Sequence, residues 1–173
     1  MIERISEILR DAEKNGSVVS VFTNKFCPEN CCVGFVAYHD DGVIIKHLTS
    51  TGINDGFYWR RVCDIYRLDL DGNYETDLKQ LYFLQEQTHD LLEVKDNSLI
   101  TLLKYASENQ KIAEICIDET ETQENIIGIP KYDSTSNCLK INRTDGLHNE
   151  NGITFISIED IVKLSVDAQE NRI

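Results

Sequence analysis

The residues best suited to recognition chemistry lie in the run Tyr58-Trp59-Arg60-Arg61. Aromatic rings stack on nucleobases and guanidinium groups pair with phosphates or carboxylates, so this run is a candidate surface for single-stranded RNA. A second interpretation places Trp59 in the core of a strand and leaves Arg60 and Arg61 at the rim. With the aromatic and histidine side chains that border the turn 39–42, the predicted binding residues are Tyr38, His39, Tyr58, Arg60 and Arg61.

The cysteine-rich run 27–32 is a candidate metal site. Cys27 and Cys31 have a C-x3-C spacing that could begin a zinc site, which needs four ligands. No second ligand pair follows in the sequence, although Cys63 or a histidine could complete the set in space. Three other cysteines align with apolar positions, as core residues do: Cys32, Cys116 and Cys138. We therefore expect the chain to hold no metal and to need no cofactor.

The remaining polar residues form no recognisable catalytic motif. The four histidines are scattered without metalloprotease spacing, the serines lack a nucleophile elbow, and no glycine-rich loop could cradle a phosphate. The run 69–72 is similar to part of a calcium loop, but Leu78 occupies the position of the bidentate glutamate. The sequence thus predicts a protein that is not an enzyme.

The chain is strongly acidic, with 17 Lys and Arg against 30 Asp and Glu and a net charge of −13. Such a field repels phosphate backbones and excludes a generic nucleic-acid coat protein, whereas it suits a basic protein partner. The apolar runs are far shorter than the roughly 20 residues of a membrane span, and the first residues do not form a signal peptide. We expect a cytoplasmic protein with reduced cysteines and no membrane association.

The two halves of the sequence can be aligned with each other at a nearly constant offset. At an offset of 94 residues, glycines, tyrosines and lysines coincide: Gly34, Tyr38 and Lys46 with Gly128, Tyr132 and Lys140. After a two-residue insertion the offset becomes 96, and the run 56–68 aligns with 152–164, so that Trp59 matches Phe155. Apolar character agrees nearly throughout, which indicates an internal repeat.

Each copy of the repeat has the pattern of one helix followed by five short strands. Apolar residues at helical spacing in 5–12 and 99–106 predict the helices. Alternating and apolar runs then predict bent antiparallel strands, with an Asp-Gly turn at residues 41 and 42 and a one-turn corner before the fifth strand. Five such strands in about 70 residues favour a small closed barrel, because closure leaves no exposed sheet edge.

The predicted organisation is therefore mainly β with helices. Residues 1–72 form the first barrel, 73–96 an amphipathic helical connector, and 97–173 the second barrel. The connector carries six acidic residues and two lysines beside one apolar stripe, so we expect it to pack on a barrel rather than to act as a flexible tether.

This arrangement resembles the Sm-like small barrels, the family that includes the bacterial RNA chaperone of the Sm type. The resemblance covers both repeats, about 140 residues, and is best at the closing corners and strands 62–68 and 158–164. It implies two tandem Sm-like five-stranded barrels, each preceded by a helix. It also implies rings made by pairing the fourth strand of one subunit with the fifth strand of the next, and RNA bound by the loops at 39–42 and near 60–61.

The sequence as a whole predicts a non-catalytic tandem Sm-like module with an RNA-associated or assembly role. Its partners would be single-stranded RNA, bound through Arg60, Arg61 and the neighbouring aromatics, and further copies of the chain, bound through barrel edge strands. The alternative is an acidic adaptor or inhibitor that binds a basic protein and no nucleic acid.

Overall fold

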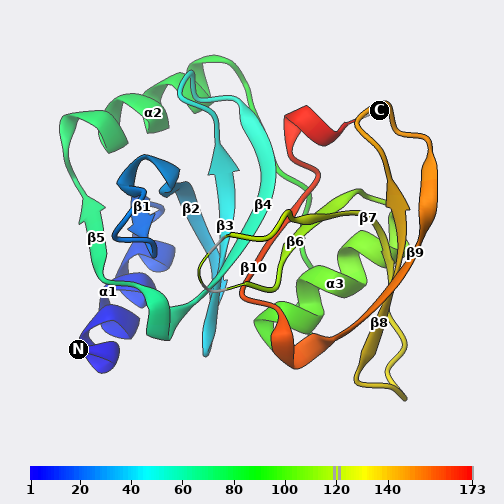
Figure 1. Ribbon diagram of the computed structural model, residues 1–173. Helices are drawn as coiled ribbons and strands as arrows, with labels where there is room; N and C mark the ends of the chain where they lie inside the picture. Colours follow the sequence, from blue (N-terminus) through cyan, green and yellow to red (C-terminus); the bar gives the residue numbers. More distant parts are fainter. Residues whose placement is uncertain (119, 121, 173) are drawn as a thin grey trace.

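The computed structural model describes residues 1–118, 120 and 122–172. These residues form three α-helices and one antiparallel sheet of ten strands, so the protein is mainly β (Figure 1). The helices are α1 (Ile2–Asn15), α2 (Asn73–Leu84) and α3 (Ser98–Glu108). The strands are β1 (Val18–Phe22), β2 (Cys32–His39), β3 (Gly42–Leu48), β4 (Asn54–Arg61), β5 (Arg67–Leu70), β6 (Ala113–Cys116), β7 (Ile126–Lys131), β8 (Cys138–Thr144), β9 (Glu150–Ser157) and β10 (Lys163–Val166).

The sheet consists of two units with the same connectivity. Its strand order is β5-β1-β2-β3-β4-β10-β6-β7-β8-β9. We call α1 with β1–β5 the first unit and α3 with β6–β10 the second unit. In each unit the fifth strand lies beside the first, and the remaining strands follow in chain order. A single turn of 3-10 helix leads from the fourth strand to the fifth in both units, at Val62–Asp64 and Ile158–Asp160.

The prediction of two separate closed barrels does not describe this sheet, which is continuous and open. The fourth strand of the first unit does not pair with the fifth strand of its own unit. Instead, β4 pairs with β10 of the second unit, with Arg60 opposite Lys163 and Trp59 opposite Leu164. The backbone N–H and C=O groups at the β4 edge of the first unit are thus paired by β10 of the second unit. We call this β4–β10 pairing the seam; β5 and β9 remain at the two ends of the sheet (Figure 1).

The strand register corrects the sequence alignment of the two halves at one point. Gly34 pairs with His47 in the first unit, and Gly128 pairs with Arg143 in the second. His47 therefore corresponds to Arg143, an offset of 96. The two-residue insertion lies in the turn between β7 and β8, before the matched lysines rather than after them. Alternating apolar residues look alike at either offset, since a shift of two residues keeps every side chain on its face.

Local sequence explains the main elements of the first unit. Ile5, Leu9 and Ala12 form the buried stripe of α1, and the helix ends at Gly16, which adopts a left-handed conformation with φ of 63°. Gly34 lies where β2 passes close to β3, since a Cβ atom at this position would overlap the carbonyl oxygen of Lys46. Glycine is thus the residue that fits where the two strands come this close.

The hydrophobic core runs through the seam. One cluster lies between α1 and the inner face of the first unit. A larger cluster lies between α3 and the inner face of the second unit, and it also contains three residues of the first unit: Ile44, Phe57 and Trp59. Because side chains of β3 and β4 complete the second core, the two units share one interior at this junction.

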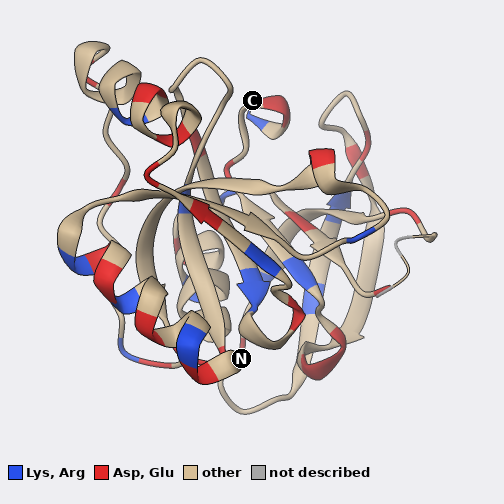
Figure 2. Ribbon diagram, turned by 90° about the vertical axis from the view of Figure 1, so that its left-hand side faces the viewer, with Lys and Arg blue, Asp and Glu red and all other residues tan. Residues whose placement is uncertain are grey.

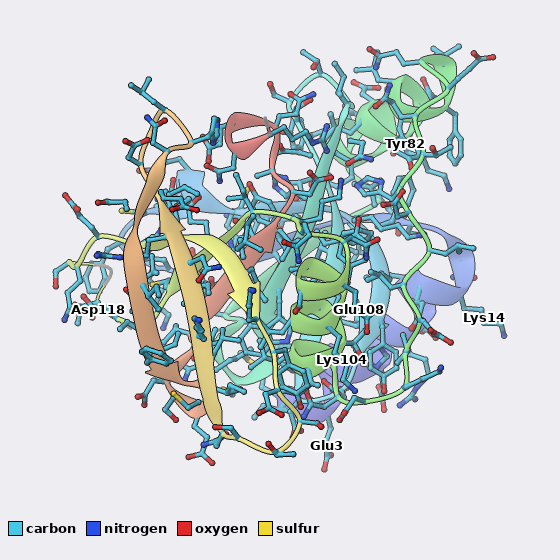
Figure 3. All side chains as sticks on the ribbon, turned by 90° about the vertical axis from the view of Figure 1, so that its right-hand side faces the viewer. Glu3, Lys14, Tyr82, Lys104, Glu108 and Asp118 are labelled. Atoms are coloured by element: carbon cyan, nitrogen blue, oxygen red, sulfur yellow. The ribbon has the colours of Figure 1, made fainter. Side chains whose placement is uncertain are left out.

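The segment between the units is only partly helical. The predicted connector helix over 73–96 ends at Leu84, and the chain then runs without regular structure to α3. Leu78 and Tyr82 bury the inner face of α2 on the first unit, while Lys104 and Glu108 lie on α3, which covers the second unit (Figure 3). Across the described residues, every helix is too short or too polar to span a membrane.

Candidate functional site

The predicted RNA-binding run on β4 is divided between the two faces of the sheet. Successive side chains of a strand point to opposite faces, so Trp59 and Arg61 face away from Tyr58 and Arg60. Trp59 is only 5% exposed, and its Nε1 donates a hydrogen bond to Ser98 Oγ at 2.9 Å. The core interpretation of Trp59 therefore describes the structure, and the two arginines do not form one basic patch.

The other predicted binding residues are engaged in contacts between elements. Arg61 Nε donates to Asp64 Oδ2 at 2.6 Å, which forms an ion pair within the corner after β4. Tyr38 packs partly buried against the second core, and His39 Nδ1 lies 3.4 Å from Glu13 Oε2 of α1. Among the described residues, no contact joins Tyr38 or His39 to Tyr58 or Arg60.

The turn 39–42, which the family resemblance assigned to RNA, is bound to the start of α3. The backbone N–H of Ser98 donates to Asp40 Oδ2 at 2.8 Å, and Ser98 Oγ donates to Asp40 Oδ1 at 2.5 Å. An aspartate at a helix N-terminus is stabilised by the unpaired N–H groups there. The turn thus fixes the second unit to the first, and the Asp40 carboxylate accepts its hydrogen bonds from Ser98.

Tyr58 and Arg60 line a pocket of about 570 Å³ at the seam, on the face of the sheet opposite to Trp59. The first unit contributes residues 29–31, His47 of β3 and the two β4 residues, and the second unit contributes β6, β10 and residues 123–125. Sequence reasoning selected Tyr58 and Arg60 but missed the contribution of the second unit, because the seam joins strands that are about 100 residues apart.

Arg60 is the central cation of this seam pocket. Its side chain is 8% exposed, and its Nη1 donates to the carbonyl oxygen of Trp59 at 2.9 Å. The guanidinium carbon lies 5.4 Å from the centroid of the Tyr58 ring, a cation–π distance. Lys163 is its cross-strand partner on β10, and burial together with the charge of Arg60 lowers the pKa of Lys163.

A histidine–aspartate pair supports the wall of the pocket. The rings of His47 and Tyr58 stack with centroids 3.7 Å apart, and His47 Nδ1 donates to Asp55 Oδ2 at 2.9 Å. Burial lowers the pKa of His47, although Asp55 acts in the opposite direction. Burial raises the pKa of Asp55, but hydrogen bonds from His47 and from the Gln169 N–H outweigh it and lower that pKa. The pair is thus an anchor for Tyr58.

Burial governs the two neighbouring thiols of Cys31 and Cys32. Burial raises the pKa of Cys31, which lines the seam pocket, and raises that of Cys32 to about 12. Both thiols therefore stay protonated at neutral pH and are poor nucleophiles. Among the described residues, no three His, Cys, Asp or Glu side chains lie close enough together to hold a metal ion.

His89 fastens the segment after α2 to the middle of the sheet. Its Nε2 lies 3.1 Å from the carbonyl oxygen of His47 and 3.0 Å from that of Gly56, so it donates to both. Its Nδ1 lies 3.1 Å from the Tyr82 hydroxyl and accepts from it. Neutral imidazole protonated on Nε2 satisfies all three contacts. Burial lowers the pKa of His89 to about 4, despite the two carbonyl contacts, which raise it.

We expect His89 to make the fold less stable in mild acid. Its folded pKa of about 4 lies below 6.5, the ordinary pKa of a solvent-exposed histidine, so the unfolded chain binds a proton first as the pH falls. The contribution of His89 to the free energy of unfolding is complete above pH 6.5 and decreases by up to about 3 kcal/mol towards pH 4. Urea unfolding of wild type and His89→Gln across this pH range measures the loss of stability. The wild type should lose more stability than the variant, and equal losses would contradict the assignment.

The two free edges of the sheet carry exposed apolar side chains. On β9, Ile153 is 54% and Phe155 is 65% exposed, and on β5, Leu70 is 37% exposed. Their counterparts at the seam are buried: Phe57 is 2%, Trp59 5% and Val166 0% exposed. The alignment of Trp59 with Phe155 was the sequence signal for these positions, but it did not distinguish a buried strand from an exposed one.

Comparisons with protein-family models, with curated proteins and with solved structures each found no match to this chain.

Proposed function

We propose that this chain is a non-catalytic assembly module of two Sm-like units, which joins further copies of itself end to end. In this assembly β9 of one copy pairs with β5 of the next, as β4 pairs with β10 within the chain. The observation that carries the proposal is the contrast between the seam and the two free edges. The same positions that are buried at the seam expose large apolar side chains at the edges.

The register of the seam predicts the register between copies. Within the chain, Leu164 lies opposite Trp59 and Val166 lies opposite Phe57. Applying the offset of 96 places Leu68 opposite Phe155 and Leu70 opposite Ile153. These four side chains are all apolar, so the two edges are complementary in chemistry as well as in hydrogen bonding. Burying them would complete the core of the first unit, just as Phe57 and Trp59 complete the second core.

The backbone at the free edges already has the conformation of the seam. Gly56 has φ of 78°, and a Cβ atom on it would overlap the carbonyl oxygen of Val166 across the seam. Gly152 has φ of 85°, yet the nearest heavy atom to a Cβ there is Arg143 Nη2 at 3.2 Å. After the facing strands, Asp71 and Asp167 also share a left-handed conformation, with φ of 61° and 60°. These backbone positions thus already match those of the paired strands at the seam.

The geometry favours self-assembly over the other predicted roles. An RNA surface would need the turn 39–42 and Arg61, but these are bound to Ser98 and Asp64, and the net charge of −13 repels a phosphate backbone. A basic protein partner remains a prediction from charge. Neither partner accounts for two complementary edges on one chain.

The mass of the protein in solution tests the proposal. We expect light scattering after size exclusion to give wild type a mass that is a multiple of 19.8 kDa. Phe155→Glu should give a mass of 19.8 kDa, because a carboxylate facing Leu68 would be desolvated without a partner. The folded monomer should tolerate this change, since Phe155 is exposed.

Leu91→Glu is the matched control. Leu91 is 95% exposed and lies in the segment between α2 and α3, away from both edges of the sheet. This variant should assemble like wild type. A wild-type protein that stays at 19.8 kDa at every concentration, or a Phe155→Glu variant that keeps the full assembly, would refute the proposal.

A further inference from the structure

We propose that the seam pocket binds a small oxyanion, a phosphate or carboxylate group, through the guanidinium of Arg60. The pocket forms within one chain, between β4 and β10, so this site does not rest on the association of copies. It lies on the face of the sheet opposite to α3, and its volume of about 570 Å³ is within the range of small-molecule sites.

The first argument is the uncompensated charge of Arg60. Its side chain is 8% exposed, yet among the residues that the structure describes no Asp or Glu oxygen lies within ion-pair distance of its guanidinium. A guanidinium has five N–H donors, and the structure gives one of them an acceptor, the carbonyl oxygen of Trp59. Burial of a charge without a partner is costly, so an anion from outside the chain would stabilise this residue.

The second argument is that the unused donors of Arg60 are accessible from the pocket. The buried side-chain nitrogen and oxygen atoms without a hydrogen-bond partner belong to other described residues: His39, Thr144 and His148. The nitrogen atoms of Arg60 are therefore not sealed inside the protein, and Arg60 lines the seam pocket. The planar fork of a guanidinium binds two oxygen atoms of a phosphate or carboxylate at once.

Neighbouring basic groups reinforce the positive potential at this position. Lys163 lies opposite Arg60 across the seam and lines the same pocket. Figure 2 shows basic segments on neighbouring strands in the middle of the sheet, in a chain with a net charge of −13. A bound anion would reduce the repulsion between Arg60 and Lys163, because like charges close together repel one another.

The surroundings of the pocket limit the ligand to a small one. Four carboxylates line the same pocket, so a polyanion such as RNA would meet them: exposed Glu29, Glu124 and Glu170, and half-buried Glu114. His47 covers one face of the Tyr58 ring, which prevents a nucleobase from stacking there. A single oxyanion at Arg60 avoids both obstacles.

The site occurs once per chain. At the offset of 96, the second unit has Ile156 in place of Arg60 and Thr154 in place of Tyr58. An interface between copies at β9 and β5 would thus lack the guanidinium and its aromatic support. The second unit has the corresponding strand, β9, but the cation occurs only on β4 at the seam.

Isothermal titration calorimetry of the full chain with inorganic phosphate and with acetate tests the inference, in a buffer free of other oxyanions. We expect saturable binding of at least one probe by wild type and at least tenfold weaker binding by Arg60→Met. Arg61→Gln is the matched control, since Arg61 is the next residue on β4 but pairs with Asp64 on the opposite face. This control should bind as wild type does.

The probes separate the possible sources of the anion. Binding of phosphate alone assigns the site to a phosphate-bearing ligand, and binding of both probes extends it to carboxylates. Should Arg60→Met fail to fold, Arg60→Lys retains the charge without the fork and should bind more weakly than wild type. No saturable binding of either probe by wild type, or equal binding by the Arg60 variants, would overturn the inference. Loss of assembly in Phe155→Glu should leave anion binding unchanged.

Discussion

Trp59→Ala is expected to lower the free energy of unfolding by about 3–5 kcal/mol, the cost of truncating a buried tryptophan. Trp59 is 5% exposed, belongs to the core of the second unit although it lies on a strand of the first, and donates to Ser98 Oγ. Its removal leaves a cavity at the seam, where Gly42 provides the close approach for the indole ring. Urea unfolding followed by far-UV circular dichroism measures the loss, since Trp59 is the only tryptophan available for fluorescence.

Phe155→Ala is the matched control for this prediction. Phe155 occupies the corresponding position of the second unit but is 65% exposed. In a dilute, monomeric sample the change should therefore cost less than about 1 kcal/mol, as most surface substitutions do. Similar losses in the free energy of unfolding of the two variants would contradict the prediction that only Trp59 contributes to the core. A cost of Phe155→Ala that grows with protein concentration would instead report the assembly, because association stabilises the folded state by mass action.

The strand content and the connectivity of each unit could be predicted from the sequence. Helical spacing of apolar residues marked α1 and α3, and the turn at Gly42 marked the hairpin of β2 and β3. The prediction of two closed barrels was wrong, since the hydrophobic pattern of a strand does not identify its hydrogen-bonding partner. Whether β4 pairs with β5 or with β10 depends on contacts between residues far apart in the chain.

The candidate site was predictable only in part, for a related reason. Sequence adjacency placed Arg60 and Arg61 together, whereas the alternation of a strand puts them on opposite faces. Arg60 meets Lys163 because of the seam, and Arg61 meets Asp64 because of the one-turn corner after β4. The sequence supplied the residue types, but the pairing of the two units decided which of them share a pocket.

Assembly through β9 and β5 has a directional consequence. An interface between two different edges is head-to-tail, and it leaves one free edge of each kind on every open chain of copies. Such an assembly continues until it closes into a ring or forms a filament, depending on the rotation between successive copies. Blocking either edge should therefore stop growth. Phe155→Glu blocks β9 and keeps β5, whereas Leu70→Glu blocks β5 and keeps β9.

Mixing these two variants is expected to restore one interface and no more. Each variant alone should have a mass of 19.8 kDa, and an equimolar mixture should have twice that mass, since the free β9 of one variant pairs with the free β5 of the other. Light scattering at equal total concentration distinguishes the two states. A symmetric interface between identical edges would behave differently, because the variant that keeps the edge would then dimerise without mixing. A mixture that stays monomeric would show that these edges do not recognise each other.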